Sequence, residues 1–304
     1  GPNRWLGVRR SSDGGRTWGP MKLVVDEGPN TMGNPCPVQD RQTRTIWLPI
    51  TRNRGEDSQE QIVSRTAKGT REVWILKSDD DGVTWSKPVE ITASVKRPDW
   101  TWYATGPGCG IQLRSGRLLI PCDHYVAETR MKRSHVMYSD DHGKSWKIGG
   151  VVGDHTNECQ AVELRNGTVL INMRSYHGKN RRAAATSRDG GLTWSEVRLD
   201  EALIEPVCQA ALIATRRREL VFSNPSSERR ERMTLKVSRD DGKNWRMVRV
   251  LHAGPAAYSA LAELRDGSVA CLYERGEKSA YEKITLARLP PGPYWRGASE
   301  EPRG

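Results

Sequence analysis

The sequence lacks the features that mark several large classes of protein. It contains a single Phe among 304 residues, and none of its apolar runs is long enough to cross a membrane. Its six cysteines include no Cys-x-x-Cys pair, the usual spacing of a zinc site. The formal net charge is +11, yet there is no long Lys/Arg block and no RNA-binding motif. We therefore expect no membrane span, no metal site and no nucleic-acid partner, and a basic surface that favours anionic glycans instead.

What the sequence has in abundance is one turn motif, Ser-x-Asp-x-Gly-x-Thr-Trp, in which Ser or Asn also replaces Thr. A short Asp side chain folds back onto turn amides, Gly accepts a positive φ, and Trp leaves the turn to pack on a sheet. The starts are separated by 67, 61, 48 and 51 residues, a period that suits one four-stranded unit per repeat. The five copies begin at Ser11, Ser78, Ser139, Ser187 and Ser238.

Between the motifs the chain predicts hairpins of short strands. The clearest unit has strands over 159–164 and 168–173 around the turn Arg165-Asn166-Gly167, because Asn-Gly between apolar runs is a strong hairpin signal. A third strand over 182–186 then enters the next motif. Similar hairpins are expected over 110–122 and 259–273, and further units begin near 37–38 and 209–212.

The repeated motif is the Asp box, and its spacing resembles that of the sialidase (neuraminidase) superfamily, whose members are six-bladed β-propellers. The resemblance predicts an all-β, six-bladed β-propeller forming a single domain over residues 1–289. The first box follows only one strand, over 5–10, so the first blade is expected to be incomplete at the N-terminus. Residues 290–304, rich in Pro, Gly and charge, are expected to form a C-terminal tail. The Asp box also occurs in non-catalytic propellers, so it leaves the activity open.

Four of the cysteines fall at one equivalent repeat position, the start of each unit's first strand. A small residue repeated around a pseudo-symmetry axis predicts packing, with free thiols behaving as small apolar groups, rather than disulfides or metal ligation. These residues are Cys36, Cys109, Cys159 and Cys208.

Hairpin geometry brings four chemically active side chains to one rim. In an antiparallel hairpin, the residue just before the first strand lies beside the residue just after the second. Glu158 and Arg174 hold these two places in one unit, and Tyr258 and Glu274 hold them in the last unit, at the same separation of sixteen residues. In a propeller such rims converge on the central axis, where a small ligand binds.

At these residues the resemblance becomes specific to bacterial and lysosomal-type exo-α-sialidases. It is carried by Asn157-Glu158-Cys159-Gln160, Asn172-Met173-Arg174, Asn224-Pro225 with Arg230-x-Arg232-Met233-Thr234, and Ala257-Tyr258-Ser259 with Leu272-Tyr273-Glu274.

The resemblance implies a role for each of these residues. Tyr258 would be the nucleophile and Glu158 the base that removes its proton. Arg174 and Arg230 would bind the substrate carboxylate, and Glu274 would orient one of these arginines. The residue types suit the chemistry, because a neutral Tyr avoids the repulsion that a carboxylate nucleophile would meet at an anionic sugar. A planar guanidinium grips a carboxylate in bidentate fashion.

The stretch 98–108 precedes an inner strand on the same rim. Its aromatic residues Trp102 and Tyr103 are expected to wall an N-acetyl or glycerol pocket, with packing between blades as the alternative. Asp123-His124-Tyr125, at the end of the next hairpin, is a weaker candidate for the pocket wall.

The implied function is release of terminal sialic acid from sialylated glycans or glycoconjugates by a retaining glycoside hydrolase without a cofactor. A secreted or periplasmic location follows from the resemblance alone. The family's third arginine and its acid/base Asp belong to the first hairpin of the first blade, which we expect to be missing, so these 304 residues alone are expected to be nearly inactive. The alternatives are a non-catalytic glycan-binding propeller, an inactive fragment, or a hydrolase for another acidic sugar.

Overall fold

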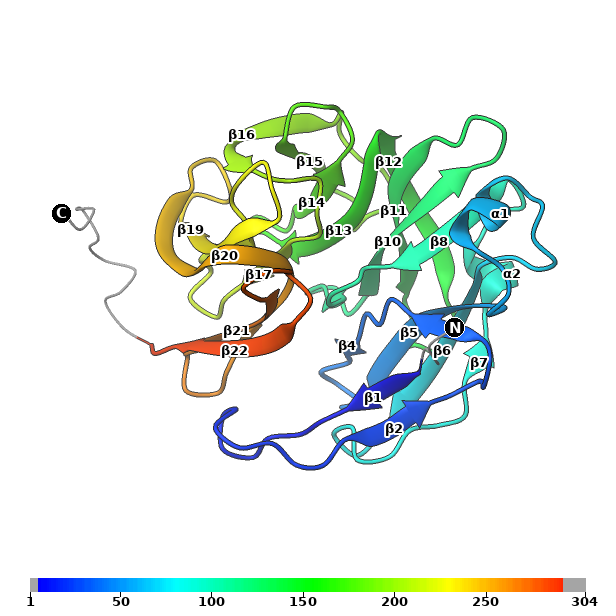
Figure 1. The fold of residues 1–304 in the computed structure, drawn as a ribbon, viewed down its shortest axis with the longest axis horizontal. Helices are drawn as coiled ribbons and strands as arrows, with labels where there is room; N and C mark the ends of the chain where they lie inside the picture. Colours follow the sequence, from blue (N-terminus) through cyan, green and yellow to red (C-terminus); the bar gives the residue numbers. More distant parts are fainter. Residues whose placement is uncertain (1–4, 292–304) are drawn as a thin grey trace.

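The strands of the chain form sheets arranged around a common centre, as Figure 1 shows. The structure is a computed structural model that describes residues 5–291. The fold is an all-β propeller, and in this part of the chain only two short helices, α1 (Gln59–Val63) and α2 (Thr92–Val95), interrupt the strands. The predicted C-terminal tail lies outside the described residues from position 292 onward.

The described strands pair into five hydrogen-bonded sheets. The first sheet has two strands, β1 (Leu6–Val8) and β2 (Lys22–Val25). The second contains β3 (Thr31–Gly33), β4 (Val38–Gln39), β5 (Ile46–Asn53), β6 (Glu72–Ser78) and β7 (Val89–Glu90). The third contains β8 (Trp100–Thr105), β9 (Ile111–Gln112), β10 (Leu118–Val126), β11 (Lys132–Ser139) and β12 (Lys147–Asp154). The fourth, with β13 (Thr156–Glu163), β14 (Val169–Ser175), β15 (Arg181–Ser187) and β16 (Arg198–Ile204), matches the predicted four-stranded unit.

The fifth sheet has six strands because one long strand joins two repeat units. It contains β17 (Ala211–Ala214), β18 (Leu220–Pro225), β19 (Glu231–Ser238), β20 (Arg246–Glu263), β21 (Val269–Arg275) and β22 (Lys283–Leu289). The first part of β20 pairs with β19 and its last part pairs with β21. Counting hydrogen-bonded sheets therefore does not give the predicted number of six.

The hairpin of β13 and β14 shows how the chain positions its rim residues. Leu164 N–H donates to Thr168 O at 2.8 Å and Gly167 N–H donates to Leu164 O at 3.1 Å, which closes the predicted turn. The register pairs Cys159 with Met173. Glu158 and Arg174 consequently lie side by side at the open end of the hairpin, opposite the turn.

All five Asp boxes form the predicted hydrogen-bonded turn. In each copy the Ser Oγ accepts from the Gly amide at 2.8–2.9 Å. The Asp Oδ2 accepts from the side chain four residues later at 2.5–2.6 Å. Every box glycine has a positive φ, between 78° and 90°. These turns are closed by their own side chains, so the box residues are structural.

The cysteines are packing residues, as predicted. All six are free thiols; five are buried, and Cys109 is partly exposed. Within residues 5–291 no group of three or more His, Cys, Asp or Glu side chains is arranged to hold a metal ion. No described helix is long and apolar enough to cross a membrane.

A buried histidine pair lies in the core of the third sheet. The Nδ1 atoms of His124 and His135 are 3.0 Å apart, and both side chains are fully buried. The Trp100 ring stacks on His124, with ring centroids 3.6 Å apart. Burial lowers the pKa of His124 to about 3 and that of His135 well below its ordinary value. The Nε2 atoms of both rings are buried without a hydrogen-bond partner among the described residues, so a proton added to either ring would create a buried charge away from water, and the pair is neutral in the fold.

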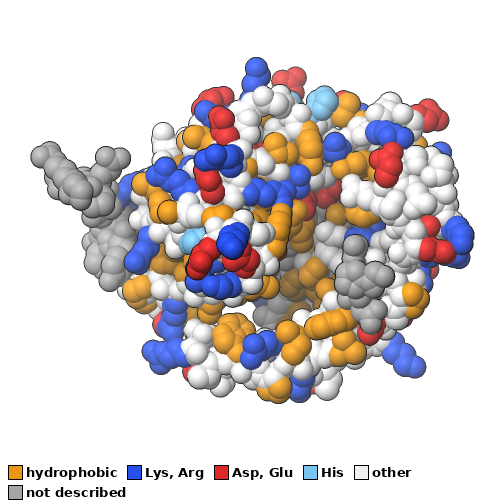
Figure 2. All heavy atoms as spheres, viewed as in Figure 1, with side chains coloured by type: hydrophobic (Ala, Val, Ile, Leu, Met, Phe, Trp, Pro, Cys, Tyr) orange, Lys and Arg blue, Asp and Glu red, His pale blue; other side chains and the backbone are white. Residues whose placement is uncertain are grey.

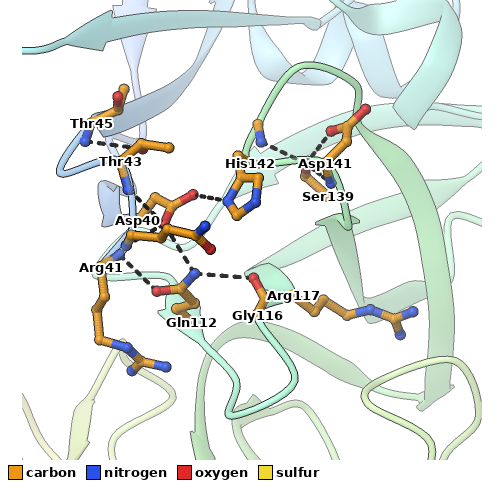
Figure 3. A network of polar contacts seen from close by, with 12 residues as sticks. Asp40, Arg41, Thr43, Thr45, Gln112, Gly116, Arg117, Ser139, Asp141 and His142 are labelled. Carbon is orange, nitrogen blue, oxygen red and sulfur yellow. Dashed lines mark hydrogen bonds and ion pairs between the residues drawn. The ribbon is translucent and has the colours of Figure 1, made fainter.

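Polar contacts tie the second sheet to the third at the end where the hairpin turns lie, as Figure 3 shows. Asp40 Oδ2 lies 2.6 Å from His142 Nδ1, and its other oxygen accepts from Gln112 Nε2 at 3.2 Å. The Arg41 amide donates to Gln112 Oε1 at 2.7 Å. The network fixes the Arg41 backbone, while the Arg41 side chain points away from it.

Candidate active site

The site is centred on a short hydrogen bond between two side chains from different sheets. Tyr258, in β20, donates its phenol O–H to Glu158 Oε1, in β13, at 2.5 Å. Burial, and then the negative charge of Glu158, raise the pKa of the Tyr258 phenol above its ordinary value of 10.0. The phenol is therefore protonated at rest, with a carboxylate acceptor already in contact with its proton.

Glu158 is shared between this phenol and an arginine. Its second oxygen, Oε2, accepts from Arg174 Nη1 at 2.9 Å, and the side chains are 10% and 15% exposed, respectively. Burial alone would lower the pKa of the Arg174 guanidinium, but the Glu158 charge outweighs it and raises that pKa. The buried Nε of Arg174 has no hydrogen-bond partner among the described residues. The Nη2 atom of Arg174 forms no hydrogen bond with the described residues and is not one of their buried atoms without a partner, so it is the donor that an incoming acceptor can reach.

Arg230 approaches the same tyrosine from the fifth sheet. Its guanidinium carbon lies 5.9 Å from the centroid of the Tyr258 ring, and its Nη1 donates to the Tyr281 hydroxyl. Burial alone would lower the pKa of the Arg230 guanidinium. The pKa is nevertheless raised, because the electrostatic interactions with Cys208 and Tyr281 favour the charged form. Two cations therefore flank Tyr258 and Glu158.

Glu274 has a different partner from the one that the sequence predicts. Its Oε2 accepts from the backbone amide of Tyr258 at 3.0 Å. The prediction that Glu274 orients an arginine is thus corrected in the described contacts: Glu274 fixes the backbone of Tyr258. Because Ser259 of β20 pairs with Tyr273 of β21, Tyr258 and Glu274 are neighbours across the two strands, and the carboxylate reaches the amide directly.

The two predicted aromatic wall residues lie in different environments. Trp102 is partly exposed, with the Arg71 guanidinium 4.3 Å from its ring centroid. Tyr103 is fully buried in a core cluster, and its hydroxyl contacts Met137 Sδ at 3.8 Å. This corrects the prediction that Tyr103 walls the pocket: its ring fills the interior of the third sheet.

Within Asp123-His124-Tyr125, only Tyr125 reaches the surface. Asp123 is 1% exposed, and its Oδ1 accepts from Asn157 Nδ2 at 2.6 Å. Burial, and then Glu158, raise the pKa of the Asp123 carboxyl well above its ordinary value. Asp123 is therefore buried and does not line the site. It contacts Asn157, the residue that precedes Glu158 in the chain.

Sequence reasoning missed two tyrosines that contact the arginines. The Arg174 guanidinium carbon lies 5.1 Å from the ring centroid of Tyr176, on which Lys132 Nζ also packs at 4.1 Å. Tyr176 had a usable signal, since it follows Arg174 by two residues at the end of β14. Tyr281, the partner of Arg230, lies in the connection between β21 and β22 and carried no pattern that would single it out.

A largely apolar groove of about 570 Å³ opens beside Tyr258 and Glu274. It is in the size range of small-molecule sites. Figure 2 shows hydrophobic side chains gathered around a hollow at the centre of one face. The apolar part of the groove wall includes Leu6, Val8, Val24, Leu48, Leu272 and Ile284.

Comparison with known proteins gives consistent matches over most of the chain. A family model described as "BNR repeat-like domain" matches residues 4–271. A sialidase of Bacteroides fragilis is 33% identical over 293 residues, which cover 88% of this chain and 54% of that protein. Sialidase-3 of Mus musculus is 30% identical over 346 residues, which cover 92% of this chain and 82% of the mouse protein.

The solved structure of the Hadza microbial sialidase Hz136 superimposes with a TM-score of 0.85 at 34% sequence identity. The match covers 94% of this chain and 59% of that one. The chain thus spans somewhat more than half the length of both the Bacteroides protein and the Hz136 structure.

Proposed function

The chain belongs to the sialidase family of BNR-repeat proteins, and from this membership we propose that it is an exo-α-sialidase, a retaining glycoside hydrolase that releases terminal sialic acid from sialylated glycans. The observation that carries the proposal is the row Tyr258–Glu158–Arg174, held by hydrogen bonds of 2.5 and 2.9 Å. A nucleophile in contact with its base, beside a cation whose Nη2 forms no hydrogen bond with the described residues, is what hydrolysis of an anionic sugar requires.

In the first step the Tyr258 oxygen attacks the anomeric carbon of sialic acid. The bond from that carbon to the aglycone oxygen breaks, and the aglycone leaves with the bonding electron pair and takes up a proton. Glu158 accepts the phenol proton while the new bond forms. Ionisation before attack is not required, which suits a phenol whose pKa is raised by burial.

In the second step water attacks the same carbon and the bond to Tyr258 breaks. The attacking water releases a proton to the solvent, which balances the proton that the aglycone took up from the solvent in the first step. The phenolate oxygen takes back a proton from Glu158, and sialic acid is released. Two successive displacements give net retention of configuration, the outcome expected for a covalent glycosyl-enzyme intermediate. No metal or organic cofactor enters either step.

Arg174 and Arg230 bind the substrate carboxylate in this proposal. The Nη2 of Arg174 supports its part, because it forms no hydrogen bond with the described residues and a bound carboxylate supplies an acceptor for it. The Arg230 guanidinium lies over the Tyr258 ring and Arg174 contacts the Glu158 carboxylate, so both cations are close to the nucleophile and its base and are available to hold the carboxylate there. The partly exposed Trp102 remains our candidate for the wall of the N-acetyl or glycerol pocket.

The repeat pattern leads us to propose six blades in a single domain over residues 1–289. Five Asp boxes and one unit without a box give six units along the sequence. Two of these units share β20 and therefore form one hydrogen-bonded sheet. The number of repeat units thus exceeds the number of sheets in this part of the molecule.

Covalent trapping with 2,3-difluorosialic acid tests the proposed function. Fluoride leaves without needing protonation, so attack by Tyr258 is separated from general acid catalysis, and the 3-fluoro group slows release of the intermediate. Mass spectrometry of a digest is expected to show one sialosyl group on the peptide that contains Tyr258. The label should be lost in Tyr258→Phe and kept in Tyr138→Phe, which removes a hydroxyl away from the site. Labelling of another residue, or of none, rejects the assignment.

A further inference from the structure

A second, strongly basic pocket lies at the opposite end of the inner strands from Tyr258. Glu158, in the proposed active site, and Glu163, in this second pocket, are at the two ends of β13. Five residues of extended chain separate them, or about 17 Å at roughly 3.3 Å per residue. The two sites therefore do not overlap. The pocket has a volume of about 300 Å³ and is lined by Arg41, Arg114, Arg165, Arg216, Arg218, Glu163 and Asp241, among others.

Hairpin-turn arginines are held in this pocket by the backbone of the next repeat unit. Arg114 donates to the carbonyl oxygens of Leu164 and Arg165 at 2.7 and 3.1 Å. Arg216 makes the equivalent pair of bonds to Leu264 and Arg265. These carbonyl contacts fix the guanidinium planes without neutralising their charge.

Arg41 joins the same pocket from the second sheet. Its Nη2 donates to Leu113 O at 3.0 Å, while its backbone is held by the Asp40–Gln112 network (Figure 3). Its side chain leaves that network on the side away from His142. Three hairpin connections thus present an arginine in a fixed position, which is the preorganisation that anion binding needs.

The charges of the pocket do not balance. Its five arginines face the carboxylates Glu163 and Asp241, and Arg216 also pairs with Glu263 at 3.3 Å, so a formal excess of two positive charges remains. Both carboxylates already have arginine partners: Glu163 lies 3.2 Å from Arg114, and Asp241 lies 3.9 Å from Arg165. The Arg218 side chain forms no hydrogen bond or ion pair with the described residues. Its five N–H donors are therefore unused within the chain.

We propose that this pocket binds a tetrahedral oxyanion, a phosphate or sulfate group, either as the free ion or as the ester group of a small molecule. Guanidinium groups match the geometry of such oxygens in bidentate fashion, and converging arginines repel one another until an anion is bound. At about 300 Å³ the pocket is at the lower end of the range for small-molecule sites, so there is space for an ester as well as an ion.

The test is a titration of the ¹⁵N-labelled chain with sodium sulfate, sodium phosphate and N-acetylglucosamine 6-sulfate, at constant ionic strength maintained with sodium chloride. Saturable shifts are expected in the amide signals of the turn 215–220 that carries Arg218. If sulfate or phosphate binds and the sulfated sugar does not, the ligand is the free ion. Tighter binding by the sulfated sugar than by sulfate, with no binding by N-acetylglucosamine, identifies it as an ester.

Two substitutions and a matched control decide the outcome. Arg218→Gln removes a side chain without contacts, so the fold should be unaffected, and affinity should fall about tenfold because charge-assisted hydrogen bonds are lost. Arg41→Gln should weaken binding as well. Arg188→Gln removes the same charge at an exposed position outside the pocket and should leave affinity unchanged. The proposal is overturned if no anion gives saturable shifts, or if Arg188→Gln weakens binding as much as Arg218→Gln.

Discussion

The phenol oxygen of Tyr258 lies 2.5 Å from Oε1 of Glu158, although the two residues are 100 positions apart in the chain. The hydrogen bond joins β20 to β13, which belong to different sheets. Its short length places donor and acceptor in position for direct proton transfer, so neither side chain needs to move before the proposed attack.

Tyr258→Phe should abolish most turnover of an aryl sialoside while leaving the fold intact. The substitution removes only the attacking hydroxyl, and loss of a nucleophile lowers kcat by about a thousandfold or more. Steady-state kinetics and a thermal unfolding curve of both proteins measure the two effects. Tyr138→Phe is the control and should keep full activity. Turnover within a few-fold of the original in Tyr258→Phe would contradict the nucleophilic role.

Arg174→Lys should weaken binding of a substrate carboxylate by about tenfold to a hundredfold. Lysine keeps the charge but cannot supply the parallel N–H groups of a planar guanidinium, whose Nη2 forms no hydrogen bond with the described residues. Calorimetric titration with sialic acid measures the change. The methyl ester of sialic acid is the matched ligand, and its weaker binding should change much less. An equal loss for acid and ester would show that Arg174 does not contact the carboxylate.

Acid should destabilise the fold through the buried histidine pair. Below the ordinary histidine pKa of 6.5, the unfolded chain takes up protons that His124 and His135 cannot accept when buried. The contribution of the neutral histidine pair to the free energy of unfolding is therefore complete above pH 6.5. It is lost as the pH falls toward about 3, the pKa of His124. The slope is about 1.4 kcal/mol per pH unit for each histidine.

Urea unfolding at several pH values between 7 and 4 measures this slope. His135→Asn keeps a polar partner for His124 and should reduce the slope by about 1.4 kcal/mol per pH unit. His155→Asn is the control, because His155 is exposed and Asn tolerates its positive φ of 59°. A slope that is the same in His135→Asn and the original chain would rule out the pair as its source.

Gly143→Ala should destabilise the protein more than Gly116→Ala. Both glycines have positive φ values, 86° and 97°, so alanine is strained at either position by about 1–2 kcal/mol. A Cβ on Gly143 would also lie 2.1 Å from the Trp47 ring, whereas nothing lies within 4 Å of one on Gly116. The clash should add about 1–3 kcal/mol. The denaturant midpoints of the two variants are compared. An equal loss of unfolding free energy in both would contradict a steric clash with Trp47.

Sequence patterns with fixed short offsets predicted the structure well. The Asp boxes are closed within eight residues, and the hairpin of β13 and β14 follows from its turn, so local chemistry determines both. The same hairpin rule placed Glu158 beside Arg174. The contact between Glu158 and Tyr258 followed from the family resemblance together with the propeller geometry, since no local pattern joins positions so far apart.

Features that depend on the surroundings of a residue were not predicted. Nearly every residue of β8 is buried, so alternation could not separate Tyr103 from an outward-facing neighbour. Glu274 binds a backbone amide, and every residue except proline offers one, so the sequence cannot single out this partner. Gly254-Pro255 is a typical strand-ending pair, yet β20 continues through it with shifts in register.

The continuity of β20 limits how this part of the gene can change in length. The unit of β17 enters its first strand through the six residues between β16 and β17, which lie outside regular structure and could absorb an insertion or deletion, whereas only His155 separates β12 from β13. Between the last Asp box and Tyr258 there is almost only paired strand. One residue added there would turn the following side chains to the opposite face and move Tyr258 away from Glu158. This stretch should therefore be the part of the chain least tolerant of length variation.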